Sequence, residues 1–553
     1  MINVYCENNG MSLDVALGTS LIEVADRLGL DAPLPLIAAR VNNRIKELNY
    51  RIYKPIRINF CDVSSTLGYR VYQRTLMFVA QRAVEQLFAG EKLRIRHAIG
   101  DALYCEVGER GLLTAEECAE LKAAMQGVVA QNVAIERTKL PAEEVEAAFA
   151  QRGYEDKVSL LKTRPRLYCS MWRMADSVGF FFGPLAPSTG YVALFDVQPY
   201  HNGFYLVLPD HKQPAQVAQV PTMEKMFSIF NDYSHWVNVL GVPTVGRLNA
   251  KILRGDAGEL IKIAEAVHEK ILSRIADRIA EAHRERGVKL VLLSGPSSSG
   301  KTTTAKRLGI QLRVLGLEPA LIELDDYFVE RVRTPRDENG EYDFEALEAI
   351  DLEQLNDHLR RLSAGESVDI PRYDFITGTR QWHESPLQLN ERSVLIMEGI
   401  HGLNPRLTPG IPDDAKFRIY ASCFTSVAMD DVSRIHTSDN RLLRRIIRDN
   451  AKRGYKAADT IARWPSVRRG EEKHIFPYQE NADVMFNSSL LYELSVLRPF
   501  AEPLLREIPD TRPEYAVAQG LLKFLDNFTP VVPDEIPPTS VLREFIGGSS
   551  FKY

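Results

Sequence analysis

The chain has 553 residues, 45% of them hydrophobic and 25% charged, and its formal net charge at pH 7 is −5. A chain of this length is too long for one hydrophobic core, so several domains are expected. No apolar run reaches the roughly 18 residues that cross a bilayer, and the first residues lack a secretory signal, so we expect a cytoplasmic protein that makes no membrane contact.

The six cysteines lie far apart and show no two-residue or four-residue spacing, which argues against a disulfide framework and a thiolate zinc site. We expect reduced, structural thiols. The net charge indicates no general affinity for nucleic acid. The cysteines are Cys6, Cys61, Cys105, Cys118, Cys169 and Cys423.

Residues 1–62 alternate short apolar runs with turns and predict a small α+β module. Residues 63–225 combine helical spacing with strand-like runs and predict a second α+β domain. Its expected helices cover 69–88, 115–130 and 142–150, and its expected strands include 191–197 and 203–208.

A helical linker is expected over residues 226–287. Asp256 and Glu259 have the spacing of a capping box, and apolar residues then recur at helical spacing up to Gly287. This pattern predicts one long helix that joins the front of the chain to its back.

Residues 288–500 alternate buried-strand patterns with helical ones, as in a doubly wound α/β domain with a parallel sheet. The expected strands are 289–294, 320–324, 393–397 and 417–421. Residues 501–553 are expected to form a helix and a tail, and the proline-rich part after about Asn527 predicts a loosely attached surface segment.

A complete phosphate-binding loop follows the first of these strands. Its glycines let the backbone turn so that N–H groups face a phosphate chain at the positive end of the next helix. Lys301 is expected to reach the β- and γ-phosphates, and the Thr302 hydroxyl to bind Mg²⁺. The expected ATP-binding residues are Gly295, Ser297, Ser298, Ser299, Gly300, Lys301, Thr302 and Thr303.

Carboxylates follow two other expected strands. Asp325 and Asp326 follow residues 320–324, and Glu398 directly follows residues 393–397. We expect the strand 320–324 to lie beside the strand that enters the phosphate loop. Ligands of open α/β sheets bind at this carboxyl edge. A carboxylate there can accept the proton of an attacking hydroxyl or hold a metal.

Residues 440–473 are rich in cations. Arginines of a mobile lid can neutralise the charge of a transferring phosphoryl group. A solvated basic helix face or a nucleic-acid patch is the alternative interpretation. The cations are Arg441, Arg444, Arg445, Arg448, Lys452, Arg453, Arg468, Arg469 and Lys473.

Over about residues 286–500 the chain resembles the uridine kinase and phosphoribulokinase family. The motifs that carry the resemblance are the phosphate loop, the Asp-Asp-Tyr-Phe segment, residues 371–380, the Met-Glu-Gly-Ile segment and residues 444–454. The resemblance implies ATP-dependent phosphoryl transfer to a nucleoside, with Mg²⁺ as cofactor. The roles that it implies are Asp325 as general base, Thr302 and Glu398 as Mg²⁺ ligands, Tyr373, Phe375 and Arg380 around the nucleoside, and Arg448 and Arg453 in the lid.

One position departs from that family. Gly378 stands where uridine kinases usually carry a histidine that contacts the base, so the pyrimidine preference does not carry over and the nucleoside stays open. A kinase for another small alcohol, such as a sugar phosphate or pantothenate, is the near alternative. A protein that binds RNA and uses ATP as a switch is the alternative from another class.

The front half resembles the amino-terminal region of threonyl-tRNA synthetase, through residues 37–43 and the pattern of 68–87 and 95–104. The resemblance implies a β-grasp module of the TGS type followed by an editing-like α+β domain. The four metal-binding positions of the editing domain carry Arg74, Phe78, Phe195 and Pro199, none of them a normal zinc ligand.

We therefore predict that this domain has lost metal-assisted hydrolysis of mischarged tRNA. His97, His201 and His211 are the remaining candidate ligands. RNA binding by this half stays an open alternative, and analogy with the family predicts a homo-oligomer.

Overall fold

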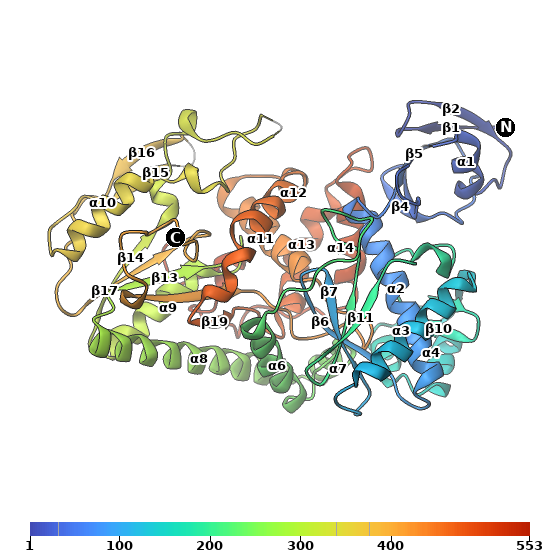
Figure 1. The fold of residues 1–553 in the computed structure, drawn as a ribbon, viewed down its shortest axis with the longest axis horizontal. Helices are drawn as coiled ribbons and strands as arrows, with labels where there is room; N and C mark the ends of the chain where they lie inside the picture. The colour runs from blue at the N-terminus through green and yellow to red at the C-terminus, as the bar shows by residue number, and fades with distance from the viewer. Residues whose placement is uncertain (31, 339, 375–376) are drawn as a thin grey trace.

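The computed structural model describes residues 1–30, 32–338, 340–374 and 377–553 (Figure 1). None of the helices in these ranges is both long and apolar enough to span a membrane. All six cysteines are free and buried.

The first module is one five-stranded sheet in the order β2-β1-β5-β3-β4, with one helix packed on it. Ser20 caps that helix in a true capping box with Glu23. β1 and β5 pair in parallel and the other strands antiparallel. The elements are β1 (Ile2–Cys6), β2 (Ser12–Val15), α1 (Leu21–Leu28), β3 (Ala38–Val41), β4 (Arg44–Glu47) and β5 (Ile56–Cys61).

The second domain has two antiparallel sheets, β11-β12-β7-β6 and β10-β9-β8. α2 runs through its core, so that residues on nearly every side of the helix are buried. The elements are α2 (Thr66–Leu87), β6 (Leu93–Ile99), β7 (Ala102–Val107), α3 (Ala115–Ala130), β8 (Ile135–Pro141), α4 (Ala142–Gln151), α5 (Glu155–Lys162), β9 (Tyr168–Met174), β10 (Ser177–Gly179), β11 (Asp196–Tyr200) and β12 (Gly203–Val207). The strand expected at 191–197 is wrong in its first part, because β11 begins only at Asp196 and a 3-10 helix ends at Tyr191.

Three helices connect this domain to the rest of the chain: α6 (Glu224–Val239), α7 (Val245–Leu253) and α8 (Ala257–Arg286). α8 runs along the edge of the molecule in Figure 1. Its apolar side chains pack on the parallel sheet, so it belongs to the core of the C-terminal part. The expected capping box is wrong, since the Asp256 side chain makes no cap hydrogen bond and pairs with Arg254 at 3.5 Å.

The C-terminal part is built on a five-stranded parallel sheet in the order β14-β17-β13-β18-β19. Helices cover both faces. The elements are β13 (Leu290–Ser294), α9 (Lys301–Val314), β14 (Glu318–Glu323), α10 (Leu352–Ser363), β15 (Pro371–Asp374), β16 (Thr379–Trp382), β17 (Ser393–Glu398), β18 (Lys416–Ser422), α11 (Thr437–Arg453), α12 (Ala457–His474), β19 (Val484–Asn487), α13 (Glu493–Arg506), α14 (Tyr515–Leu525) and α15 (Arg543–Ile546).

One expectation about this sheet is wrong. β14 does not lie beside β13, because β17 pairs with both of them and separates them. The crossover from β14 to β17 carries the chain back between the first two strands. Glu398 at the end of β17 therefore lies on the strand next to the one that enters the phosphate loop, and the acidic segment after β14 lies one strand farther out.

The tail after Asn527 is also not a loose surface segment. Its apolar residues are buried in a cluster with α8 and α13. Val531 N–H donates to the Ser495 carbonyl at 3.0 Å. The isolated apolar residues of the tail gave no periodic pattern, and only their contacts with distant segments reveal their role. They are Val531, Ile536, Val541, Leu542 and Phe545.

Candidate active site

The phosphate loop joins the end of β13 to the start of α9. At Gly295 an added Cβ would collide with the carbonyl of Ala421 on β18, so only glycine fits there. The hydroxyls of Ser298 and Ser299 are buried and have no hydrogen-bond partner among the described residues. Unsatisfied donors at the N-terminus of a helix make a site that fits an anion.

Two buried arginines of α11 hold the outer side of this loop. Arg441 Nη1 donates to the Ser297 carbonyl at 3.1 Å, and Arg444 Nη1 to the Ser298 carbonyl at 3.4 Å. Each also pairs with a buried carboxylate, Arg441 with Glu471 and Arg444 with Glu493. A solvated basic face is therefore wrong for these two arginines, which are parts of the core.

Glu398 lies at the end of β17, where Thr302 reaches it. The Thr302 hydroxyl donates to its carboxylate, and the residue is only 8% exposed. Burial, together with the neighbouring Glu323 and Asp325, raises the pKa of Glu398 to about 8, although Lys301 opposes the shift. A buried carboxylate with too little positive charge nearby fits a hard cation.

A 3-10 helix, Leu324–Tyr327, carries the acidic pair beyond β14. Burial raises the pKa of Asp325, and the positive charges that act against this shift are Lys301, Arg453 and Arg448. The structure thus brings the four expected catalytic residues together. Asp326 instead accepts the backbone N–H of Tyr373 at 3.2 Å, and this bond ties the acidic segment to β15.

The last turns of α11 hold more positive than negative charge. Asp449 is the shared partner of Arg445 at 3.2 Å, Arg448 at 3.0 Å and Arg453 at 3.6 Å. Arg445 also donates to the Ser297 hydroxyl at 2.9 Å. Three guanidinium groups thus gather around Asp449 at this end of the helix, and two of them, Arg448 and Arg453, act on the pKa of Asp325.

The residues expected around the acceptor occupy the hairpin of β15 and β16, and Phe375 lies outside the described residues. Tyr373 is buried. Arg380 makes four hydrogen bonds within the protein, to the carbonyls of Phe328 and Tyr327 and to the side chains of Asp351 and Gln354. In this structure Arg380 holds the backbone at the end of the 3-10 helix that carries Asp325 and Asp326.

Gly378 has φ +73°, and a Cβ there would lie 2.8 Å from Arg331 Nε. The Arg331 N–H donates to the Gly378 carbonyl at 3.1 Å. A guanidinium group therefore fills the space in which a histidine side chain at position 378 would begin.

The tail reaches the helix that follows the phosphate loop, a contact that sequence reasoning missed. The Thr303 hydroxyl donates to Glu544 at 2.6 Å and lies 2.9 Å from the Tyr553 hydroxyl. Lys306 and Lys452 approach the Tyr553 ring at 4.6 and 3.8 Å. Thr303, expected to bind ATP, is thus bound by the tail in this structure.

Of the four editing-domain positions, two are buried, Arg74 is half-buried and Pro199 is exposed. Arg74 Nε donates to the Pro184 carbonyl at 3.1 Å, and Phe78 and Phe195 are buried. Among the residues that the structure describes, no group of three or more His, Cys, Asp and Glu side chains could hold a metal ion, and the three histidines named above have other contacts. His97 stacks on Phe230, His201 pairs with Glu224 and His211 pairs with Asp101.

The two halves of the chain match different groups of known proteins. The N-terminal half matches threonine–tRNA ligases. The ligase of Clostridium kluyveri is 27% identical over 33% of this chain and 29% of its own length, and that of Carboxydothermus hydrogenoformans is 25% identical over 43% and 37%. This chain therefore spans less than two fifths of these relatives.

For the C-terminal part, a solved structure of a possible uridine kinase from Bacillus stearothermophilus is 22% identical and covers 36% of this chain and 89% of that one, with a TM-score of 0.25. Residues 290–492 match the profile described as the Phosphoribulokinase / Uridine kinase family. The C-terminal part of the chain therefore contains a kinase domain of the Phosphoribulokinase / Uridine kinase family.

Proposed function

We propose that this protein transfers the γ-phosphoryl group of ATP to the 5′-hydroxyl of a nucleoside, with Mg²⁺ as cofactor. The observation that carries the proposal is a phosphate loop whose Thr302 donates to the buried Glu398, with Asp325 within the electrostatic influence of Lys301, Arg448 and Arg453. Phosphoryl transfer needs positioning, neutralisation of negative charge and a base for the acceptor hydroxyl, and this arrangement offers all three.

The phosphate chain of ATP binds along the loop from Gly295 to Thr302. The loop carbonyls of Ser297 and Ser298 are engaged by arginines, which leaves backbone N–H groups at the start of α9 for phosphate oxygens. Lys301 lies between this loop and the acidic edge, where it can follow the charge of the γ-phosphoryl group.

Thr302 and Glu398 would hold Mg²⁺. The Thr302 hydroxyl donates a hydrogen bond to Glu398, and burial raises the pKa of this carboxylate to about 8. The hard oxygen ligands and the phosphates of ATP match the preference of this ion. When bound, Mg²⁺ supplies charge neutralisation at the phosphate oxygens.

Asp325 is the general base in this proposal. The proton of the acceptor hydroxyl passes to its carboxylate as the hydroxyl oxygen bonds to phosphorus and the bond to ADP breaks. The raised pKa makes this carboxylate a better proton acceptor than an exposed aspartate. Arg448 and Arg453 stabilise the charge on the transferring group.

The proposal has two forms, which differ in the acceptor molecule. The Arg331 guanidinium lies beside Gly378 at the end of the β15–β16 hairpin, and guanidinium groups bind carbonyl, carboxylate and phosphate oxygens. The nucleoside form uses it to bind a base carbonyl. A sugar phosphate is the second candidate, and the same guanidinium would then bind the phosphate of the acceptor.

For the front half we propose a TGS-like module and an editing-like domain without deacylase activity. The five-stranded sheet around α1 supports the first, and the synthetase match supports both. The Arg74 guanidinium, bonded to the Pro184 carbonyl, stands where a metal ligand would be needed. A cation at that place repels a metal ion.

The test is ADP release by the full chain with ATP and Mg²⁺, measured for each common ribonucleoside, deoxyribonucleoside and sugar phosphate. Wild-type protein is expected to turn over with one class of acceptor, and Lys301→Ala to lose that turnover. Turnover of sugar phosphates alone would replace the nucleoside form by the second one. ATP binding without turnover of any acceptor would overturn the kinase proposal.

A further inference from the structure

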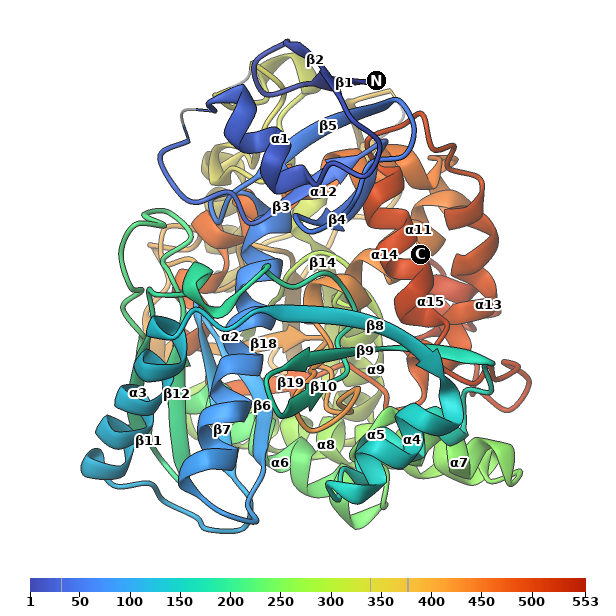
Figure 2. The same ribbon diagram turned by 90° about the vertical axis from the view of Figure 1, so that its right-hand side faces the viewer.

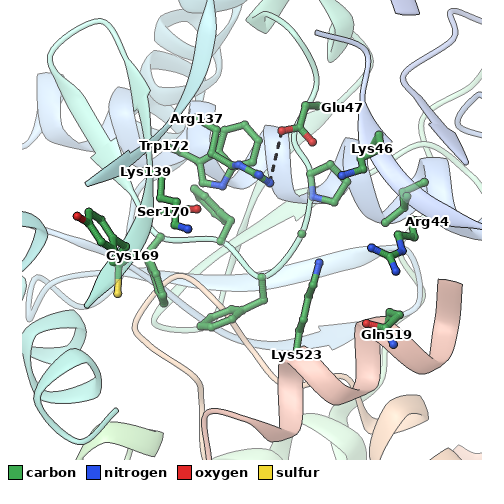
Figure 3. A pocket seen from close by; sticks show the side chains of 18 of the residues that line it. Arg44, Lys46, Glu47, Arg137, Lys139, Cys169, Ser170, Trp172, Gln519 and Lys523 are labelled. Atoms are coloured by element: carbon green, nitrogen blue, oxygen red, sulfur yellow. Dashed lines mark ion pairs between the residues drawn. The ribbon is translucent and has the colours of Figure 1, made fainter. Parts of the chain in front are cut away.

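A second charged cavity lies far from the phosphate loop, where three parts of the chain meet. We call it the interdomain cleft (Figure 3). Its walls are β4 of the first module, β8 and β9 of the second domain, and α14 of the C-terminal part. Figures 1 and 2 place α14 beside β4, and Arg44 Nη2 donates to the Tyr515 hydroxyl at 2.9 Å across this contact. The cleft has a volume of about 450 Å³.

Four cations of the cleft have no ion pair with any carboxylate among the residues that the structure describes: Arg44, Lys46, Lys139 and Lys523. They come from all three walls. In Figure 3 Lys523 extends from α14 toward Lys46. Burial lowers the pKa of Lys46 although Glu47 opposes the shift, and burial together with Arg137 and Arg44 lowers that of Lys523 against the same carboxylate.

Three more cations line the cleft and share two carboxylates. Arg137 pairs with Glu47 at 3.4 Å. Arg164 pairs with Asp526 at 3.1 Å, and Arg166 contacts the same carboxylate. The cleft thus has a surplus of positive charge that nothing within the described chain neutralises, and an anionic ligand would remove the repulsion.

Aromatic rings stand among these cations. Tyr168 is 55% exposed, and Lys139 lies 5.6 Å from its ring centre. Trp172 is buried beneath the guanidinium of Arg137. An exposed ring beside cations suits a ligand that joins a flat base to phosphate groups, since the base stacks while cations bind the phosphates.

We infer that the interdomain cleft binds a nucleoside polyphosphate, at a site separate from the phosphate loop. The volume of about 450 Å³ lies within the range of about 300–1,000 Å³ that is typical of small-ligand pockets. Because Lys46, Lys139 and Lys523 stand on different parts of the chain, a bound ligand joins the three parts at one point. The site does not depend on the proposed kinase reaction.

The test is isothermal titration calorimetry on the full chain with ATP, GTP, CTP and UTP, with tripolyphosphate as the probe that lacks a base. Because Lys301→Ala weakens nucleotide binding at the phosphate loop, the binding that this variant retains can be assigned to the second site. At least one nucleotide is expected to bind this variant, more tightly than tripolyphosphate. Adding Lys139→Gln and Lys523→Gln is expected to weaken that binding at least tenfold.

The matched control is Lys162→Gln in the same background, because Lys162 is an exposed lysine of the second domain that pairs with Glu146 outside the cleft. It is expected to leave binding unchanged. Hydrogen exchange adds a readout that does not depend on the variants: the bound nucleotide is expected to protect β8 and α14.

Three results would overturn the inference. One is no nucleotide binding to Lys301→Ala, and another is binding that the two cleft substitutions leave unchanged. The third is tight binding of a single-stranded RNA oligonucleotide, lost in the cleft variant, with none of mononucleotides; the cleft would then be an RNA site.

Discussion

Two groups of cationic side chains differ in whether a carboxylate accompanies each cation. On α11, Arg441 and Arg444 each have a buried partner and support the phosphate loop from outside. In the interdomain cleft, Lys46, Lys139 and Lys523 have no ion pair within the described parts of the chain. Paired, buried arginines hold a fold together, whereas cations gathered without partners lower stability and are retained where a ligand can neutralise them.

The largest expected effect comes from breaking a buried pair. Arg444→Met leaves Glu493 charged and unpaired in the core, and we expect the free energy of unfolding of the C-terminal part to fall by about 3–5 kcal/mol. Denaturant unfolding measures the change. The double variant Arg444→Met, Glu493→Leu should recover most of the loss, and a loss below about 1 kcal/mol in the single variant would contradict a structural role.

Arg448 tests the C-terminal end of the same helix, where the arginines share one carboxylate. Since it faces Asp325 and shares Asp449 with two other arginines, Arg448→Ala should lower kcat by about 10²–10³-fold and change stability little. Steady-state kinetics and thermal unfolding together separate the two effects. Arg463→Ala on α12 is the control. An equal loss of stability and activity would place Arg448 with the buried, structural arginines.

Glu544 tests the contact of the tail with the phosphate-loop helix. Glu544→Gln removes a negative charge beside Thr303, so the KM for ATP should fall by roughly fivefold, the effect of about 1 kcal/mol of charge repulsion. Glu535→Gln, an exposed carboxylate of the same segment, should leave KM unchanged. A rise in KM would show instead that Glu544 supports ATP binding.

The smallest effect is expected in the cleft. Lys523→Gln removes a repelled cation, so the protein without ligand should keep or gain stability, by up to about 0.5 kcal/mol. Thermal unfolding measures this change, and an added nucleotide should stabilise the wild type more than the variant. A loss of stability in the variant without ligand would show that Lys523 has a structural partner.

Much of the C-terminal site follows from local sequence. Short patterns predict the phosphate loop between a buried strand and a helix, Asp325 after β14 and Glu398 at the end of β17, and α8 falls close to its expected bounds. The order of the strands does not follow, because a crossover can return to either side of β13 and no local pattern records the choice.

Contacts between distant segments account for the rest. Arg441 and Arg448 lie on the same helix and have the same side chain. Arg441 is buried in the core because it pairs with Glu471, which lies on another helix. The tail carries single apolar residues such as Phe545 without periodicity, so its burial cannot be read from the sequence. The interdomain cleft draws its cations from segments hundreds of residues apart, each with only a few charges.

The most direct measurement is transfer of label from γ-³²P-labelled ATP to the acceptor by wild type, Asp325→Asn and Asp326→Asn. The neighbouring Asp326 is a matched control, since an asparagine there can still accept the Tyr373 N–H. We expect Asp325→Asn to slow transfer by about 10²–10⁴-fold and Asp326→Asn to keep it within a few-fold of wild type. Equal losses in both variants, or full transfer by Asp325→Asn, would contradict the assignment of Asp325 as the base.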